Sequence, residues 1–458
     1  MRRLLPSVAE AWPVVFNSAS LVGSIVVNSA LGFVFWWLAA RSFDPADVGL
    51  AAASIAAMTL FGTVGVMGLG TLLIGELSQR QGEKLALITT SMAAAGLAGA
   101  VLGLAFVAVA PIISPDLAVL RSSLGIASLF AVGTGLIAAT LVLDNALIGL
   151  LRGGIQLGRN ALFGVAKLLA LIAAVAFMTA SALEIFAAWV VGAAVALLVA
   201  LWWLAVNASR TRSSLLPRPS LLKGLGRSAV AHHTLNVSLQ AAGQLMPLVV
   251  TAVLSATANA YFYTASMVAY LVYIAPSSLA TVFYAVGAAD PSAMRRRLRL
   301  TIGLGLVAAV AGNLVLLVAA RPVLSLFGES YAREALVPLQ LFALQAFTFV
   351  VREHYVAVKR VEASPLAAAP KVVIGAALKI VMASIGAKLN GLTGLAVGII
   401  IASLIEAAWM APTVIRAARR PANAGVSGGM AEAGDVDGSE LARRQVVPEP
   451  VARQGGGR

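Results

Sequence analysis

Four basic side chains lie inside long apolar stretches of the sequence, where a charged group needs a partner. They are Lys167, Arg352, Lys371 and Lys379. A charge at membrane depth is costly unless it meets an opposite charge, and ammonium and guanidinium groups both bind phosphate. Arg binds it through two parallel hydrogen bonds, whereas Lys acts as a point charge. These cations therefore predict that an anionic, phosphate-bearing molecule is bound within the apolar part of the protein.

The same cations also have simpler structural explanations. Lys167, Arg352 and Lys371 lie toward the predicted cytoplasmic ends of their apolar runs, from which long side chains can reach the membrane surface. Asp144 lies at a similar depth on a neighbouring run and could pair with Lys167. Glu353 could neutralise a nearby cation. All four cations stay candidate binding residues, with Lys379 the deepest and Arg352 supported by a one-sided polar stripe on its predicted helix.

Three carboxylates could couple movement of a substrate to an ion. Asp144, Glu76 and Glu406 lie within or beside apolar runs, and their spacing selects none of them. We carry Asp144 forward as the candidate coupling residue. The chain has no cysteine, and its three histidines form no metal-binding motif, so we expect neither a metal nor another cofactor.

Two polar stripes with identical spacing occur far apart in the sequence. One consists of Asn17, Ser20, Ser24 and Asn28, and the other of His233, Asn236, Gln240 and Gln244. Positions i, i+3, i+7 and i+11 share one helix face. Such a face could simply hydrogen-bond a neighbouring helix, but two matching stripes favour a cavity between two halves of the protein. The predicted cavity residues are Ser24, Asn28, Asn236 and Gln240, together with Gln345, which shares a stripe with Arg352.

The composition identifies the kind of protein that holds these residues. The chain is 60% hydrophobic and 11% charged, with a mean hydropathy of +0.92. Soluble globular chains contain about 45–50% apolar and about 25% charged residues. The sequence therefore predicts an all-α polytopic membrane protein. Its net charge of +14 is explained by basic cytoplasmic loops and a basic tail, so no nucleic acid is expected as a partner.

A bilayer-crossing helix needs about 20 mainly apolar residues, and this criterion predicts twelve spans. The first six are 14–40, 47–75, 86–110, 122–150, 160–181 and 184–206. The second six are 228–254, 258–287, 300–320, 335–358, 366–387 and 392–416. Most Lys and Arg residues fall in the loops on the side of the N-terminus. Both termini are therefore predicted to be cytoplasmic, in the inner (plasma) membrane.

A polar, basic break divides the chain into two parts of six spans each. The predicted divisions are an N-terminal half (1–206), a cytoplasmic linker (207–227), a C-terminal half (228–417) and a disordered basic cytoplasmic tail (418–458). An even number of spans leaves both halves facing the same way. They are then two parallel six-helix repeats around a central cavity.

The turn at residues 40–49 is the most distinctive local motif. Pro45 cannot continue a helix, Asp44 can cap the helix that follows, and Gly49 allows two backbones to approach closely. Residues 255–261 join the corresponding two spans of the second half and form a shorter version of the same turn. The turn is therefore predicted to belong to the repeat architecture, on the outer side of the membrane.

Several weak motifs occur in a characteristic order along the chain. They lie at residues 40–53, 65–71, 259–265, 323–331 and 335–340. In this order they resemble the polysaccharide flippases of the multidrug/oligosaccharidyl-lipid/polysaccharide exporter superfamily, over residues 14–416. Twelve spans fit the O-antigen type, whereas peptidoglycan-precursor flippases usually have two further spans. The resemblance implies that a lipid-linked saccharide moves by alternating access, with its pyrophosphate in a basic central cavity.

The leading hypothesis is therefore a transporter that flips a polyprenyl-pyrophosphate-linked oligosaccharide to the outer leaflet for cell-surface polysaccharide biosynthesis. Its expected partners are the lipid-pyrophosphate-linked glycan, membrane lipids, and a glycan polymerase or glycosyltransferases. One alternative is a multidrug or small-molecule antiporter of the same superfamily, which should present buried carboxylates to a cationic substrate. Another is a polytopic glycosyltransferase or polymerase, but the predicted outer loops are short for an enzyme of that kind.

Overall fold

The computed structural model describes residues 8–80, 82–178, 181–211, 214–223, 226–289, 294–362 and 365–419. Regular secondary structure in these ranges is entirely helical, which confirms the predicted all-α fold. The first helices are α1 (Val8–Ser42), α2 (Pro45–Gly65), α3 (Leu69–Gln79), α4 (Lys84–Ile113), η1 (Pro115–Arg121), α5 (Leu124–Gly149), α6 (Gly153–Phe177) and α7 (Ala182–Thr211). The later ones are η2 (Pro219–Leu222), α8 (Gly226–Val253), α9 (Ala256–Ala289), α10 (Met294–Ser325), α11 (Glu329–Glu334), α12 (Leu336–Val361), η4 (Pro365–Ala368) and α13 (Ala369–Arg419).

Ten helices in the described ranges are long and apolar enough to cross a bilayer, as expected for a multi-pass membrane protein. Two of the predicted twelve spans do not appear as separate helices in this count. In α8 several side chains before Gly243 lie outside the described residues, and the described part Gly243–Val253 is a short apolar helix. Helix α13 counts once although it consists of two arms, because its backbone leaves the helical conformation only at Asn390 and Gly391.

The two arms of α13 fold back on each other as a tight hairpin. Gly391 has a φ of +52°, a conformation that residues with a Cβ rarely adopt. The arms then approach so closely that a Cβ on Gly386 would lie 2.0 Å from the carbonyl oxygen of Gly394. The bend falls between the predicted spans 366–387 and 392–416. Residues at similar distances from Gly391 on the two arms therefore lie at similar depth in the bundle.

The predicted span 47–75 is interrupted in the structure. Helix α2 ends at Gly65, and α3 starts at Leu69 after a turn in which Met67 and Gly68 have φ angles of 50° and 77°. Because glycine adopts this left-handed conformation without strain, Gly68 allows the chain to change direction here. The interruption leaves carbonyl groups at the end of α2 available to side chains from other helices.

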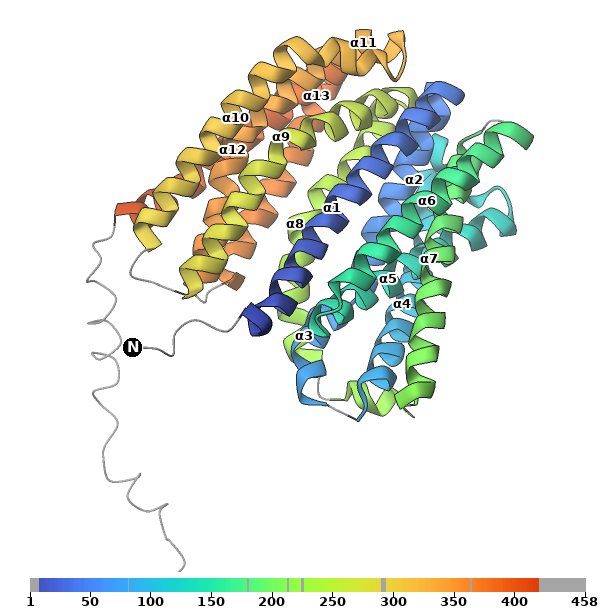
Figure 1. The fold of residues 1–458 in the computed structure, drawn as a ribbon. Coiled ribbons are helices and arrows are strands. Elements are labelled where there is room, and N and C mark those ends of the chain that lie inside the picture. The colour runs from blue at the N-terminus through green and yellow to red at the C-terminus, as the bar shows by residue number, and fades with distance from the viewer. Residues whose placement is uncertain are drawn as a thin grey trace, which may run out of the picture.

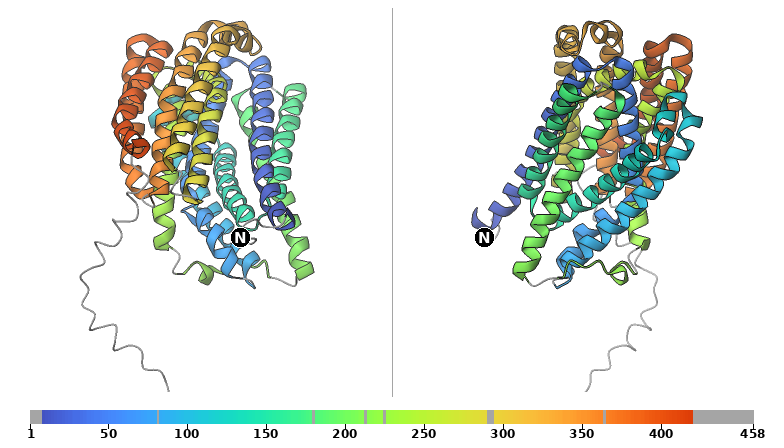
Figure 2. Two further views of the ribbon diagram at one scale, coloured as in Figure 1. Left: turned by 60° about the vertical axis from the view of Figure 1, so that its left-hand side comes forward. Right: turned by 90° about the vertical axis from the view of Figure 1, so that its right-hand side faces the viewer.

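The helices form two groups with α8 between them. Figure 1 shows α1 to α7 on one side and α9, α10, α12 and α13 on the other, and the two turned views in Figure 2 agree. Helix α1 packs on α6, α4 on α5, α9 on α10 and α12, and α12 on α13, while α2 contacts both α8 and α9. The residue boundaries predicted for the two halves and the linker stay a prediction. The predicted tail lies beyond the described residues from position 420 onward.

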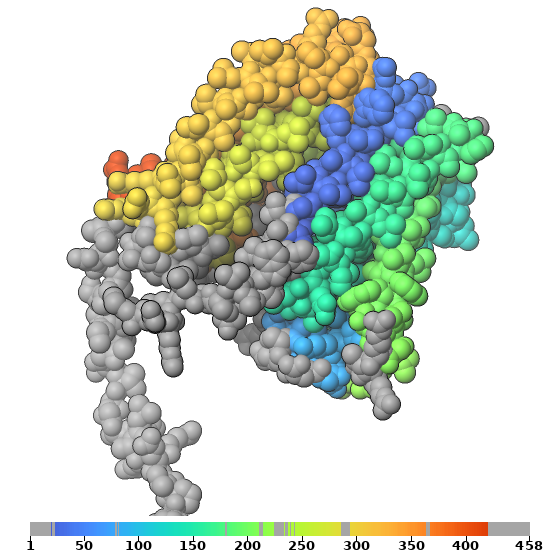
Figure 3. All heavy atoms as spheres, viewed as in Figure 1, coloured from blue at the N-terminus to red at the C-terminus, as the bar shows by residue number. Residues whose placement is uncertain are grey.

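The outside of the bundle is apolar, as a lipid-facing surface requires. Figure 3 shows α9 and α10 on one flank of this surface and α1 and α6 on the other. Val307, Leu314 and Val318 of α10 are exposed to 66%, 61% and 79%. Exposed apolar side chains on this scale would be unfavourable in water. They support placing these helices in a bilayer.

The turn between α1 and α2 packs directly against the start of α9. The Nδ2 of Asn259 donates a hydrogen bond to the Gly49 carbonyl at 2.7 Å. A Cβ on Gly49 would lie 1.7 Å from the carbonyl oxygen of Ala256, which confirms the close backbone approach predicted for this glycine. The two turns that correspond in sequence are therefore in contact. Asp44 occupies the N-cap position of α2 as predicted, although its side chain makes no capping hydrogen bond.

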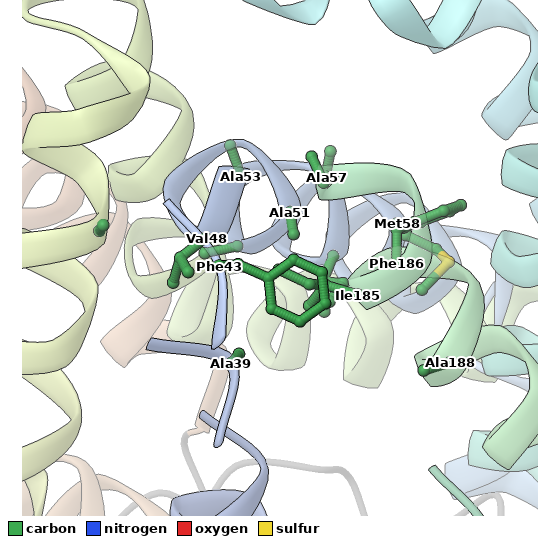
Figure 4. Packing of buried hydrophobic residues seen from close by; sticks show 14 of the residues in the cluster. Ala39, Phe43, Val48, Ala51, Ala53, Ala57, Met58, Ile185, Phe186 and Ala188 are labelled. Atoms are coloured by element: carbon green, nitrogen blue, oxygen red, sulfur yellow. The ribbon is translucent and has the colours of Figure 1, made fainter. Parts of the chain in front are cut away.

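A hydrophobic cluster surrounds this contact. Figure 4 shows Phe43 and Val48 beside the turn, packed with Ala51 and with Ile185 and Phe186 of α7. The same cluster includes side chains from the later helices, namely Leu248, Ala260, Phe327 and Tyr331. The Nε1 of Trp37 also donates to the Leu326 carbonyl at 3.0 Å. Close packing and hydrogen bonds of this kind hold helices together within a membrane.

Candidate functional site

Four charged side chains of α12 and α13 form what we call the ion cluster, consisting of Arg352, Glu353, Lys379 and Glu406. The Lys379 ammonium donates to Glu406 Oε2 at 2.5 Å, and Arg352 Nε lies 3.7 Å from Glu406 Oε1. Arg352 Nη1 lies 3.8 Å from Glu353 Oε1. Glu406 is buried, and the other three side chains are only partly accessible. The structure thus brings two of the predicted cations, Arg352 and Lys379, to one place.

The hairpin of α13 positions the centre of this cluster. Lys379 and Glu406 lie on opposite arms at similar distances from the bend, so the fold places them side by side. Gly375, one turn before Lys379, provides the space, because a Cβ there would lie 2.3 Å from Glu406 Oε1. Helix α12 packs along α13 and adds Arg352 from the side.

Two other predicted residues do not join the cluster. Lys371 donates to the Trp409 carbonyl at 2.9 Å, and its ammonium lies 5.0 Å from the centre of the Trp409 ring. Gln345 is half-buried, and its carbonyl accepts a hydrogen bond from Thr348 at 2.9 Å. Their predicted role in a cavity stays a prediction.

A second buried ion pair joins α5 and α6. Arg159 Nη2 donates to Asp144 Oδ2 at 2.7 Å, and Arg159 Nε donates to Asp144 Oδ1 at 3.1 Å. This bidentate geometry is the strongest form of the interaction. The partner considered for Asp144 from the sequence, Lys167, is wrong. Asp144 and Arg159 are nearly equidistant from the turn at Leu150–Arg152. This spacing could have predicted their pairing from the sequence.

Lys167 lies instead in a box of aromatic rings. Its ammonium lies 3.8 Å from the ring centre of Trp189, 4.5 Å from that of Phe163 and 5.1 Å from that of Phe35. The side chain is only 1% exposed, and no carboxylate in the described part of the chain pairs with it. Ring faces attract a cation, with about 2 kcal/mol or more when it is desolvated. Trp189 and the two phenylalanines were not predicted, since helical spacing alone does not distinguish them from core residues.

The first polar stripe divides between packing and exposure. Ser20 and Ser24 are buried, and the Ser24 hydroxyl accepts a hydrogen bond from Asn160 of α6. Asn28, one turn farther along α1, is exposed. The interhelical hydrogen bond considered for such a stripe therefore accounts for Ser24. Asn28 is exposed, and its predicted place in a polar cavity stays a prediction.

The second stripe shows the same division. His233 contacts the Val64 carbonyl at 3.1 Å, at the interruption between α2 and α3. Gln240 is exposed and Gln244 is half-buried. The side chain of Asn236 lies outside the described residues. Asn28 and Gln240 are thus exposed on corresponding helices of the two predicted halves.

Several solved membrane transporters have a similar fold over most of this chain. An inward-facing multidrug resistance MATE family transporter of the MOP superfamily has a TM-score of 0.66 at 13% identity, covering 87% of this chain and 98% of that one. The lipid II flippase MurJ in an inward closed conformation has a TM-score of 0.70 at 12% identity, covering 87% and 89%. The chain has the fold of MOP superfamily transporters. A MOP superfamily transporter from Pyrococcus furiosus, described as having a binding pocket of reverse polarity, has a TM-score of 0.58 at 13% identity, covering 89% and 96%.

Neither a protein-family model nor a curated protein matches this sequence. At 12–13% identity the similarity to MATE and MurJ concerns the fold, and it assigns no substrate. Within this MOP-type fold, the polarity of the buried charges is the feature that bears on chemistry. Each of the two predicted halves contains a buried carboxylate paired with one or more cations, whereas the Lys167 ammonium contacts aromatic rings within the described residues.

The pair between Asp144 and Arg159 is expected to be essential for stability. Asp144→Asn leaves the guanidinium, which is 5% exposed, without its counter-charge, and such a loss costs about 3–5 kcal/mol. The melting temperature of the purified protein should fall clearly. Glu334→Gln is the matched control, because its pair with Arg333 is exposed and worth less than about 1 kcal/mol. Equal melting temperatures for the two variants would contradict a stabilising role of the buried pair.

Proposed function

We propose that this protein is a transporter that flips a polyprenyl-pyrophosphate-linked oligosaccharide from the inner to the outer leaflet of the cytoplasmic membrane by alternating access. Both termini are then cytoplasmic, and the substrate is loaded from the side on which such precursors are made. Membrane lipids and the enzymes that assemble or polymerise the glycan are the proposed partners. The protein itself carries out no covalent step in this proposal.

The pairing of the carboxylates within the spans carries this proposal. Away from the helix ends, Asp144, Glu353 and Glu406 each lie within 4 Å of an arginine or lysine. A transporter of cationic drugs needs a carboxylate that can receive the substrate's charge. Lys167, in contrast, is a cation with no carboxylate partner in the described chain. This balance favours a substrate that carries negative charge.

Two further observations support a lipid-linked substrate. The fold is shared with the lipid II flippase MurJ. Asn28 on α1 and Gln240 on α8 are exposed polar side chains on helices that cross or enter the membrane. Such groups avoid lipid and are suited to hydrogen-bond sugar hydroxyls in a space between the two helix groups.

Reconstitution in vesicles tests the proposal. We expect vesicles with the protein to expose a fluorescent polyprenyl-pyrophosphate oligosaccharide from both leaflets to an impermeant quencher, and protein-free vesicles to expose it from one. Arg352→Ala should lower this activity at least about tenfold, because Arg352 belongs to the ion cluster. A tenfold change in rate corresponds to a change of only about 1.4 kcal/mol in the activation free energy. Arg321→Ala is the control, since this arginine and its partner Glu329 are about 70% exposed. Transport of a cationic dye without movement of the lipid would identify a drug antiporter instead.

A further inference from the structure

Glu406 occupies the position that an anionic substrate group would need. Its two oxygens contact two different cations, Oε2 with Lys379 at 2.5 Å and Oε1 with Arg352 at 3.7 Å. Two cations that hold two oxygens of one carboxylate can equally hold two oxygens of a phosphate. The carboxylate therefore fills an anion site made by residues of two helices.

The Glu406 carboxylate has room for its position because residue 375 is glycine. A Cβ on Gly375 would lie 2.3 Å from Oε1 and 2.5 Å from Cδ of Glu406. The carboxylate is the far end of a flexible side chain, so it can move away from this position. Ser403, one turn before Glu406, has a buried hydroxyl with no hydrogen-bond partner in the described part of the chain. It offers the carboxyl group a hydrogen bond on the same face of the helix.

The ion cluster contains as many carboxylates as cations. The charges of Arg352 and Lys379 balance those of Glu353 and Glu406. Arg360, farther along α12 and outside the cluster, interacts electrostatically with Glu353 and lies against the Tyr284 ring. On two other helices packed against α13, His233 of α8 contacts the Val64 carbonyl, and Arg299 of α10 donates to the Ala418 carbonyl at the end of α13. An added anion would therefore leave uncompensated negative charge inside the membrane, which is costly.

We propose that Glu406 is an internal counter-anion, which the pyrophosphate of the substrate displaces from Lys379 and Arg352, and which takes up one proton when it is released. The proton comes from water on the loading side and adds to a carboxylate oxygen of Glu406. Neutral Glu406 no longer needs a cation, so one negative charge of the substrate takes its place in the charge balance. When the substrate leaves, the proton leaves as well and Glu406 pairs again with the two cations. This inference rests on the proposed function and specifies how the same protein couples transport to protons.

Calorimetric binding of farnesyl pyrophosphate to the purified full-length protein tests this exchange. Titrations in two buffers with different heats of ionisation count the protons taken up. We expect the parent protein to take up about one proton per bound ligand, and Glu406→Gln to take up none. The variant should also bind at least about tenfold more tightly, because the competing negative charge is gone. Farnesol is the uncharged control ligand.

A second variant tests whether the ligand takes the position of the Glu406 carboxylate. Gly375→Ala places a methyl group 2.3 Å from the position of Oε1, which excludes a phosphate oxygen there as well, so farnesyl pyrophosphate should bind at least about tenfold more weakly than to the parent protein. Gly303→Ala is the control for adding a methyl group, because nothing lies within 4 Å of a Cβ there. This pair also preserves the test if Glu406→Gln fails to fold.

The outcomes separate the two proposals. Tighter binding and loss of proton uptake in Glu406→Gln, with weaker binding in Gly375→Ala, support the internal counter-anion. If the parent protein binds the ligand but Glu406→Gln does not bind it more tightly, if Gly375→Ala binds it as the parent does, or if proton uptake persists in Glu406→Gln, the counter-anion is overturned and the flippase proposal stays intact. If the parent protein binds farnesyl pyrophosphate no better than farnesol, the proposed function fails and the inference fails with it.

Discussion

Gly49→Leu is expected to abolish transport while the protein still inserts into the membrane. The Ala256 carbonyl oxygen would lie 1.7 Å from a Cβ at position 49, and the Ala260 nitrogen 2.8 Å from it. Both are backbone atoms of α9, so no side-chain rotation relieves the overlap. The turn of the first half must then move away from its counterpart in the second half. The hydrogen bond from Asn259 to Gly49 would be lost with it.

The expected consequence is that the protein no longer closes at the end that carries this turn. An alternating-access transporter must close each end in turn, so a population held open at one end cannot complete the cycle. Because the chain has no cysteine, a single Ala53→Cys reports the closure without background labelling. Ala53 is fully buried one turn inside the contact. Gly49→Leu should raise its rate of maleimide labelling at least about tenfold and lower transport by a similar factor.

Gly32→Leu provides the matched control for adding a leucine to a membrane helix. Nothing lies within 4 Å of a Cβ at Gly32, so transport and labelling should both stay near the parent values. Slow labelling together with normal transport in Gly49→Leu would show that the two turns are not a seal.

Lys167→Met is expected to have opposite effects on stability and transport. Burial of a charge without an opposite charge costs several kcal/mol, and the ring contacts return about 2 kcal/mol of it. Methionine has a similar length, carries no charge and packs well against aromatic rings. The variant should therefore melt at the same or a higher temperature than the parent protein. Under the proposed function, transport of the lipid-linked oligosaccharide should fall at least about tenfold, because the variant lacks a cation that we propose interacts with the substrate.

Thermal melting and quencher accessibility on the same preparations measure the two effects together. Lys388→Met is the control, because this lysine is exposed near the bend of α13. Normal transport by Lys167→Met would assign the aromatic box a purely structural role. A strongly lowered melting temperature would show instead that the lysine stabilises the contact between α1, α6 and α7.

The predicted halves thus hold their cations in different ways. In the ion cluster, Arg352 and Lys379 are already paired with Glu406, so an incoming anion has to displace a carboxylate. In the aromatic box, Lys167 has no such competitor among the described residues, but the rings enclose it. Binding at the first site depends on exchange of charge, and binding at the second depends on movement of helices. A cycle that uses both would couple the substrate's charge to the change of conformation.

The sequence by itself determined the elements and their sharpest turns. Long apolar runs predicted the membrane helices because length and hydropathy are local properties of the chain. The bend at Gly391 falls between two predicted spans, and the close approach at Gly49 was predicted because glycine has no Cβ to clash with a neighbouring backbone. The interruption after Gly65 was not predicted, because apolar residues continue on both sides of it.

Only the tertiary structure decided which charges meet. Asp144 pairs with Arg159 and not with Lys167, and Glu406, one of three equivalent candidates in sequence, proved to be the partner of two cations. Spacing along one helix shows which residues share a face, but it does not show how that helix is rotated against its neighbours. An ion pair between helices needs atoms within about 4 Å, a distance that depends on rotation and depth together. Both are set by the packing of many side chains, which no local pattern contains.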